Sequence, residues 1–261
     1  MNLTELLQAM RVDGEGRVVA AVGDDWLQGR SLFGGVQAAI GWRAMRDLVP
    51  AQMPLRTLQM TFIAPIEQGE VVAQARVLRA GKNTMHVETR FGSGDATQAV
   101  MLCVFGSARE SQVRRTPAAP APIGERRPIP FMRGITPSFM QQFAVDLVGG
   151  AGPFSGKRVN DTAFELSLRD SGPLTEAHLL VLADFVPPVA LSWMDRPVPG
   201  SSLTWMFELL EPEFAAHAIE GWRVESHMSA ARDGYTSQTT TLFAPDGTAA
   251  ALSRQSMVVF G

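Results

Sequence analysis

Two stretches of the chain follow the same local pattern, and this internal repeat constrains the fold more than any other feature of the sequence. The stretches are RAGKNTMHVETRFGSGDATQAVMLCVFG in the first half and ARDGYTSQTTTLFAPDGTAAALSRQSMVVFG in the second. Each contains a turn, a strand that ends at Phe91 or Phe243, a Gly/Asp turn (Gly92-Ser93-Gly94-Asp95 in the first) and a last strand that ends in Phe-Gly. With small gaps the two align, which predicts one fold duplicated in tandem.

The rest of the chain supports this order of a strand, a helix and a meander in each half. The expected strands are Arg17–Val22, Leu55–Ile63, Gly69–Leu78, Thr84–Phe91 and Gln98–Ser107 in the first half, and Ser138–Val148, Thr162–Arg169, Ser202–Leu210, Gly221–Ala231, Tyr235–Phe243 and Ala249–Phe260 in the second. Leucines at helical spacing predict a short helix at the start of the chain, with Thr4 as its cap. Helices followed by antiparallel meanders predict an α+β architecture.

A longer helix is expected from the double glycine Gly34-Gly35 to Leu48. It is apolar almost all the way round, so we expect it to be wrapped by other elements rather than laid on a surface. A pair of glycines at its N-terminus lets another group approach the backbone N–H donors closely, at the positive end of the helix dipole.

Composition limits the class of protein. The chain has 261 residues, 46% hydrophobic and 19% charged, with a net charge of -3, which indicates a globular protein with ample core and no basic surface for nucleic acid. The single Cys103 excludes an internal disulfide and fits a reducing compartment, so we expect a cytoplasmic location. We expect no signal peptide and no membrane span.

Between the halves, residues 112–130 are rich in Arg, Pro and Ala. Prolines favour an extended backbone, so we interpret this segment as a linker. The expected domains are therefore 1–111 and 131–261. Isolated halves would each leave a helix face and a sheet edge uncovered, so we expect the two to pack together.

One acid stands out in the second half. A helix is expected over Thr175–Ser192, and it carries Asp184 in an otherwise apolar run before Pro187-Pro188. Even a neutral polar group costs roughly 2–7 kcal/mol when buried without a partner, so this carboxylate needs partners or a wet cavity. It either belongs to a site or caps backbone groups or pairs with an arginine such as Arg196.

Other chemistries lack support. Cys103 lies in an apolar strand, where a free cysteine behaves as a small hydrophobe. No G-x-S-x-G elbow occurs, and Gly150-Ala151-Gly152 has no following helix to bind a dinucleotide. The four histidines show no metal-ligand spacing, and His178 is expected to pack or face solvent, so we expect no metal site.

The order of elements, with Phe33-Gly34-Gly35 opening the long helix and Phe62-Ile63-Ala64-Pro65 ending the first sheet strand, resembles the double hotdog acyl-CoA thioesterases of the bacterial thioesterase II type. The resemblance covers nearly the whole chain. It implies a tandem double hotdog, each half an antiparallel sheet wrapped around one long helix. It also implies hydrolysis of acyl-CoA to a carboxylic acid and CoA, a part in fatty acid metabolism, no cofactor, and homo-oligomers of double hotdog units.

In that family an Asp on the second hotdog helix, a Thr or Ser on the following strand and a Gln on the last strand hold the attacking water. The matching residues here are Asp184, Ser202 and Gln255, with Ser201 and Thr204 near enough to compete with Ser202. The chain has Ser where the best-known members have Thr, and Phe185-Val186-Pro187-Pro188 in place of a more polar turn.

In thioester hydrolysis Asp184 would act as the general base or orient the water, while Ser202 and Gln255 would position that water. The N–H groups near Gly34 and Gly35 are the expected oxyanion donors.

Two rival functions stay open. The protein could bind acyl groups or acyl-CoA without catalysis, if the pocket is present and the water-holding residues are misplaced. A hotdog hydratase or dehydratase ranks last, because no Asp-x-Asn-Pro-x-His stretch occurs. No cluster of Arg and Lys marks a CoA phosphate site.

Overall fold

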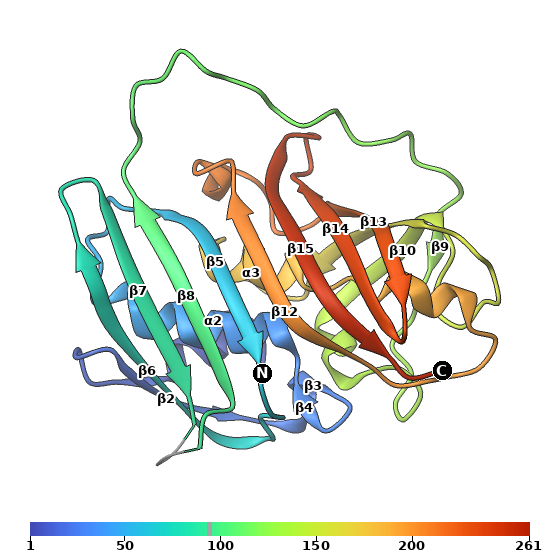
Figure 1. The fold of residues 1–261 in the computed structure, drawn as a ribbon, viewed down its shortest axis with the longest axis horizontal. Helices are drawn as coiled ribbons and strands as arrows, with labels where there is room; N and C mark the ends of the chain where they lie inside the picture. The colour runs from blue at the N-terminus through green and yellow to red at the C-terminus, as the bar shows by residue number, and fades with distance from the viewer. Residues whose placement is uncertain (93–95) are drawn as a thin grey trace.

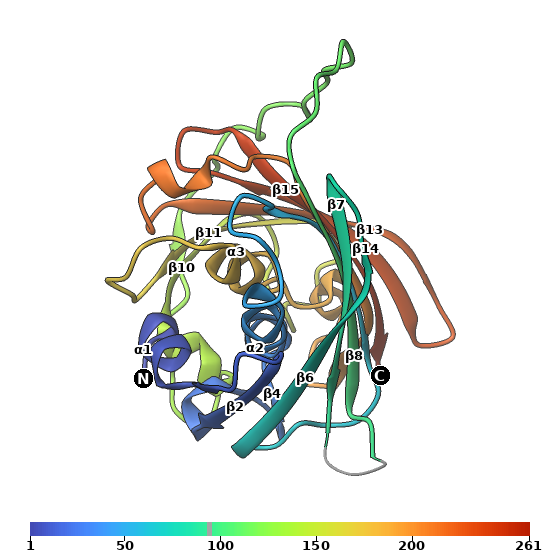
Figure 2. The ribbon, with the colours of Figure 1, turned by 90° about the vertical axis from the view of Figure 1, so that its left-hand side faces the viewer.

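A single antiparallel sheet of thirteen strands holds the chain together, and two buried helices lie against one of its faces (Figure 1). The structure is a computed structural model that describes residues 1–92 and 96–261, so most of the turn expected at Gly92–Asp95 lies outside the described residues. Seen from the side, the sheet curves around both helices (Figure 2).

In the first half, the described residues form two helices and eight strands. They are α1 (Leu3–Ala9), β1 (Arg11–Val12), β2 (Arg17–Val22), β3 (Leu27–Gln28), β4 (Ser31–Leu32), α2 (Gly34–Arg46), β5 (Leu55–Phe62), β6 (Gly69–Ala80), β7 (Thr84–Phe91) and β8 (Ala99–Gly106), with a 3-10 turn η1 (Asp24–Trp26) before β3. Strands β3 and β4 form a separate two-stranded ribbon beside the N-terminus of α2.

The second half contains one helix and seven strands. They are β9 (Arg127–Pro128), β10 (Phe143–Gly150), β11 (Asp161–Leu168), α3 (Glu176–Ala183), β12 (Gly200–Leu209), β13 (Trp222–Arg232), β14 (Tyr235–Phe243) and β15 (Ala249–Val259), with 3-10 turns η2 (Ser138–Gln142), η3 (Val189–Trp193) and η4 (Phe214–Ala216).

The strand order has the same form on both sides of the sheet centre. It runs β1-β2-β6-β7-β8-β5 in the first half and β12-β15-β14-β13-β11-β10-β9 in the second. Going outward from the central strands β5 and β12, corresponding strands of the two halves follow one another in the same order. In both halves a helix precedes the central strand in the sequence. The halves join where β12 pairs with β5, for example Phe207 with Leu58, so one continuous sheet crosses the junction.

Helices α2 and α3 cross at very close range. A Cβ added at Gly35 would lie 2.8 Å from Cα of Val181, so only a residue without a side chain permits this approach. Every residue of α3 is buried, which explains why it shows no polar face.

Glu176, in the first turn of α3, ties the two halves together at this crossing. Its Oε1 accepts the backbone N–H of Leu55 at 2.6 Å, and its Oε2 accepts the indole N–H of Trp42 at 2.5 Å. A guanidinium nitrogen of Arg46 lies 3.7 Å from the same Oε2. The carboxylate is therefore satisfied by groups of the first half although its own backbone belongs to the second.

Three sequence-based expectations about element boundaries were wrong. The helix expected over Thr175–Ser192 ends at Ala183, and η3 is a separate turn, because Pro187 and Pro188 interrupt helical hydrogen bonding. The strand expected over Ser138–Val148 begins with η2, which directs Phe139 into the core. The first helix is capped by the side chain of Asn2, in a capping box with Glu5, rather than by Thr4.

The Pro-rich segment before β9 leaves the end of β8 and arches over the upper ends of the strands to the second half (Figure 1). The N–H of Ala121 donates to Glu225 at 2.9 Å, and that of Gly124 donates to the carbonyl of Val148 at 3.0 Å. Within residues 1–92 and 96–261, none of the helices has the length and hydropathy needed to cross a membrane.

Candidate active site

Asp184 lies at the C-terminal end of α3, with 8% of its surface exposed. Its backbone N–H still bonds to the carbonyl of Leu180 at 3.2 Å, which fixes the side chain just beyond the last helical turn. Nε2 of Gln255 donates to Oδ1 of Asp184, and the backbone N–H of Gly35 lies near enough to the carboxyl group to lower its pKa. Gln255 is thus the side-chain partner of Asp184, and among the described residues Asp184 forms no ion pair with Arg196.

Burial raises the pKa of Asp184 from 3.8 to about 7, while the nearby N–H of Gly35 and the hydrogen bond from Gln255 act in the opposite direction. The carboxyl group therefore exchanges its proton close to neutral pH. This is the range in which a carboxylate both stays partly ionised and accepts a proton readily, as a general base requires.

Gly34 and Gly35 open α2 beside this carboxylate. The residue before them, Phe33, has no side-chain oxygen to cap the helix, so its first N–H groups need other partners. The N–H of Gly35 lies near the Asp184 carboxyl group and lowers its pKa, while Gly34 lines the cavity, so the role of both as oxyanion donors stays a prediction. A Cβ at Gly34 would lie 2.7 Å from Oδ2 of Asp184, so a glycine is required there for the two groups to meet.

Gln255 reaches Asp184 from β15, on the inner side of the sheet, and is buried. Its two strand partners are Trp205 on β12 and Gln238 on β14. Gln238 is a residue that the sequence interpretation missed. Its Oε1 accepts the N–H of Val189 at 2.9 Å, so it fastens the segment that follows Asp184 to the sheet. The one sequence feature that marks Gln238 is the alternation along β14, which places it on the buried face of that strand.

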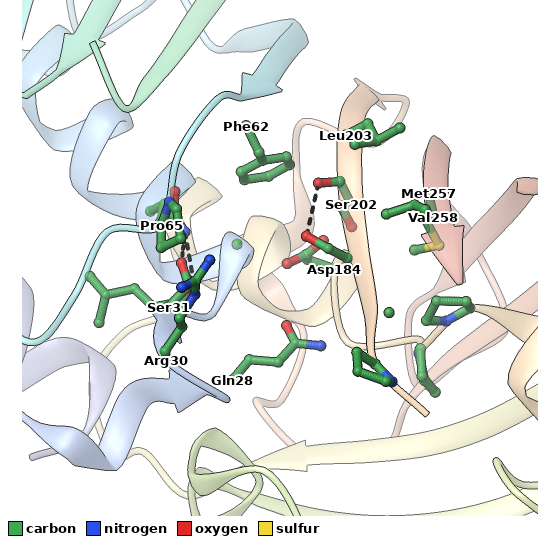
Figure 3. Close-up of a pocket in the computed structure, with 18 of the residues that line it drawn as sticks. Gln28, Arg30, Ser31, Phe62, Pro65, Asp184, Ser202, Leu203, Met257 and Val258 are labelled. Atoms are coloured by element: carbon green, nitrogen blue, oxygen red, sulfur yellow. Dashed lines mark hydrogen bonds between the residues drawn. The ribbon is translucent and has the colours of Figure 1, made fainter. Parts of the chain in front are cut away.

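Ser202 faces Asp184 across the site (Figure 3). An irregularity in the pairing of β12 with β15 falls between Ser202 and Thr204, which changes the alternation of side chains along β12. Ser202 is half-buried and lines the cavity, whereas Thr204 is exposed and does not. Ser201 is also exposed and donates its hydroxyl to the carbonyl of Ser202. Ser201 and Ser202 both line the cavity with Asp184, and Ser202 is the less exposed of the two.

The site opens into a cavity of about 510 Å³ between the N-terminus of α2, the end of α3 and the adjoining ends of β5, β12 and β15. Asp184 and Phe62 project into it from the two halves of the chain (Figure 3). Exposed Gln28 and Arg30 lie among its lining residues, on the ribbon beside α2. The volume lies within the range of small-molecule sites.

Two further polar residues of this cavity escaped the sequence interpretation. Gln37, on α2, is buried, and its Nε2 donates to the carbonyl of Leu32 at 2.7 Å. Oγ of Ser31 accepts the N–H of Ile66 at 3.2 Å. Both fix the ribbon that forms one wall, so they shape the cavity rather than add a charge.

The other candidates have structural roles. Cys103 is fully buried, and burial raises the pKa of its thiol well above the ordinary value. His178 is buried in α3, and its Nδ1 accepts the backbone N–H of Thr175 at 3.1 Å, so it completes the helix cap. Among the described residues no group of His, Cys, Asp or Glu side chains is arranged to hold a metal ion.

Solved structures with this arrangement are hotdog-fold proteins. A conserved protein of unknown function with a hotdog fold from Alicyclobacillus acidocaldarius matches with a TM-score of 0.84 and 22% identity over 100% of this chain and 99% of that one. A TesB protein of Mycobacterium avium subsp. paratuberculosis matches with 0.77 and 12% identity over 100% of both chains. The acyl-CoA thioesterase II TesB2 of Mycobacterium marinum matches with 0.73 and 15% identity over 98% and 97%. The fold is therefore the hotdog fold.

Family models assign the chain more narrowly. Residues 22–106 match the acyl-CoA thioesterase N-terminal domain, and residues 114–259 match the acyl-CoA thioesterase C-terminal domain. The chain therefore belongs to the acyl-CoA thioesterase family of thioesterase II hotdog proteins. No curated protein matches the sequence significantly.

Proposed function

We propose that the protein hydrolyses acyl-CoA thioesters to a free carboxylic acid and CoA, with Asp184 as the general base. The observation that carries the proposal is the buried Asp184 carboxyl group, whose pKa is about 7 and which lies in a cavity of the family's hotdog fold. A carboxylate outside a functional site has little reason to stay buried without a cationic partner.

In the proposed reaction Asp184 takes a proton from water while the water oxygen attacks the thioester carbonyl carbon. The tetrahedral intermediate then expels CoA as a thiolate, which takes up a proton, and the acid is released. Ser202 faces Asp184 and would hold the water between them (Figure 3). Gln255 donates to Asp184 itself, so we assign it the task of orienting the carboxylate.

The developing oxyanion needs hydrogen-bond donors in the cavity. Gly34 lines the cavity at the positive end of α2 and Gly35 does not, so we assign this role to the N–H of Gly34. In other hydrolases removal of one such donor costs about 2.7–4 kcal/mol of transition-state stabilisation.

We further propose that the chain is a tandem double hotdog, with domains 1–111 and 131–261 and a linker over 112–130. Support comes from the matching strand order on the two sides of β5 and β12, and from the separate family models for the two halves. In this arrangement the cavity lies at the junction, so neither half would hold a complete site.

Release of CoA thiol from a panel of acyl-CoAs tests the proposal. For the intact protein we expect kcat/KM to rise with pH to a plateau, with a midpoint near pH 7, because the base must be deprotonated. Asp184→Asn should retain acyl-CoA binding and lose turnover. Gln255→Leu should move the midpoint upward, because the hydrogen bond it removes lowers the pKa of Asp184. Binding without turnover of any acyl-CoA would instead indicate the non-catalytic binding protein.

A further inference from the structure

Phe185, the residue directly after Asp184, lines the cavity. It is 5% exposed, so protein atoms cover nearly all of its surface. Rings from η2, β10 and β11 pack against it, and Phe33, the residue before Gly34, stacks on the ring from η2. Together they form an aromatic cluster of Phe33, Phe139, Phe143, Phe164 and Phe185.

Three rings hold Phe185 in place. The centroid of Phe143 lies 5.0 Å from that of Phe185, Phe164 lies at 5.7 Å and Phe139 at 6.0 Å. Phe139 is itself stacked on Phe33, with centroids 4.1 Å apart and the planes inclined by 4°. All five rings are buried, and close-packed interiors leave few gaps into which a ring could turn. The wall is therefore rigid.

The cluster also lies very near the reacting groups. Phe185 follows Asp184 in the chain, and Phe33 precedes Gly34, so the two residues assigned to the water and the oxyanion each adjoin a ring of the cluster. The lining also includes exposed residues, among them Arg30, Ile63 and Phe260, which mark the part of the cavity that is open to solvent. A bulky polar CoA moiety fits this open side, which leaves the acyl group directed at Phe185.

We propose that the aromatic cluster closes the acyl end of the cavity and restricts the protein to acyl-CoAs with short acyl groups, between acetyl and hexanoyl. The proposal rests on the proposed function, because it assigns the acyl group to the Asp184 cavity. Each CH2 group of the acyl chain that is buried in the cavity, up to the aromatic cluster, strengthens binding about fourfold, the equivalent of about 0.8 kcal/mol. A longer chain gains nothing, because it must displace packed rings or bend back to the mouth.

The test is a ladder of straight-chain acyl-CoAs from acetyl to palmitoyl, with kcat/KM measured by thiol release. For the intact protein we expect kcat/KM to increase up to about fourfold per CH2 over the short members and to stop increasing by octanoyl. Phe185→Leu and Phe139→Leu should each move this break to longer chains. Phe207→Leu is the matched control, because Phe207 is fully buried on β12 outside the cluster, and its break should not move.

A second measurement separates this proposal from the proposed function. Binding of the same series of acyl-CoAs to the Asp184→Asn variant is measured by titration calorimetry. Kd should decrease with each added CH2 over the short members and stop decreasing at the same chain length at which kcat/KM stops increasing. If no acyl-CoA is hydrolysed but the break in Kd is present, the hydrolase proposal fails and the aromatic wall stands. If kcat/KM or Kd continues to improve through palmitoyl, or the break stays in place in both cluster variants, the wall does not limit the acyl group.

Discussion

Replacing Asp184 by asparagine should change how the stability of the fold depends on pH. Burial raises the pKa of this carboxyl group from 3.8 to about 7. Between these two values the folded protein retains a proton that the unfolded chain has lost, so stability falls as pH rises. At about 1.4 kcal/mol for each pH unit, the loss amounts to about 4 kcal/mol by pH 8. Asparagine has no proton to lose, so the variant escapes this decline.

The assay is equilibrium unfolding by denaturant, for both proteins, at intervals from pH 3.5 to pH 9. The useful quantity is the difference in the free energy of unfolding between the variant and the intact protein. Every other titrating group contributes equally to both, and the cost of pointing an amide at the N–H of Gly35 adds only a constant. We expect the difference to increase by about 4 kcal/mol from pH 3.5 to pH 8 and to level off above it.

A difference that stays constant within about 1 kcal/mol over this range would refute the reasoning, because it would mean that Asp184 keeps an ordinary pKa in the folded protein. The same result would remove the main support for Asp184 as a base near neutral pH. The plateau above pH 8 is an internal control, because Asp184 is then ionised in both the folded and the unfolded intact protein and its charge no longer changes with pH.

Two substitutions test the geometry around the carboxylate. Gly34→Ala should lower kcat/KM for thiol release about a hundredfold, because its Cβ would lie 2.7 Å from Oδ2 of Asp184 and displace that carboxylate. Gly152→Ala is the control. Its Cβ would meet only an ordinary contact at 3.8 Å, so kcat/KM should not change. Ser202→Ala should lower kcat with little change in the unfolding midpoint. Thr204→Ala, at an exposed position of the same strand, should leave kcat unchanged. Equal effects of the two substitutions would contradict the proposal that the Ser202 hydroxyl holds the attacking water.

Much of the fold follows from short-range patterns. The strands expected over Thr84–Phe91 and Tyr235–Phe243 have those bounds in the structure, because alternate side chains must face the core along a strand. The error at Ser138–Gln142 has a clear origin. Its apolar residues suit a strand or a turn equally well, and the stacking of Phe139 on Phe33, far away in the sequence, favours the turn.

The site was predictable in part. Asp184 stands out because it is a charged residue in an apolar run, and this needs no knowledge of the fold. Gln255 and Ser202 were identified through resemblance to a family, since each alone is an ordinary strand residue. Gln238 was missed, because its partner Val189 lies 49 positions away and nothing local marks the contact.

By itself the sequence predicted the repeat, and it determined the order of most helices and strands, the glycine pair at the start of α2 and the presence of one acid that needs partners. These features depend on neighbours within a few residues, where periodicity and polarity act directly. The tertiary structure alone decided that Gln255 donates to Asp184, that an irregularity in β12 falls between Ser202 and Thr204, and that Phe185 packs against Phe139, Phe143 and Phe164. Each of these depends on the crossing of α2 and α3 or on strand register, and such long-range placement is set by the packing of the whole chain.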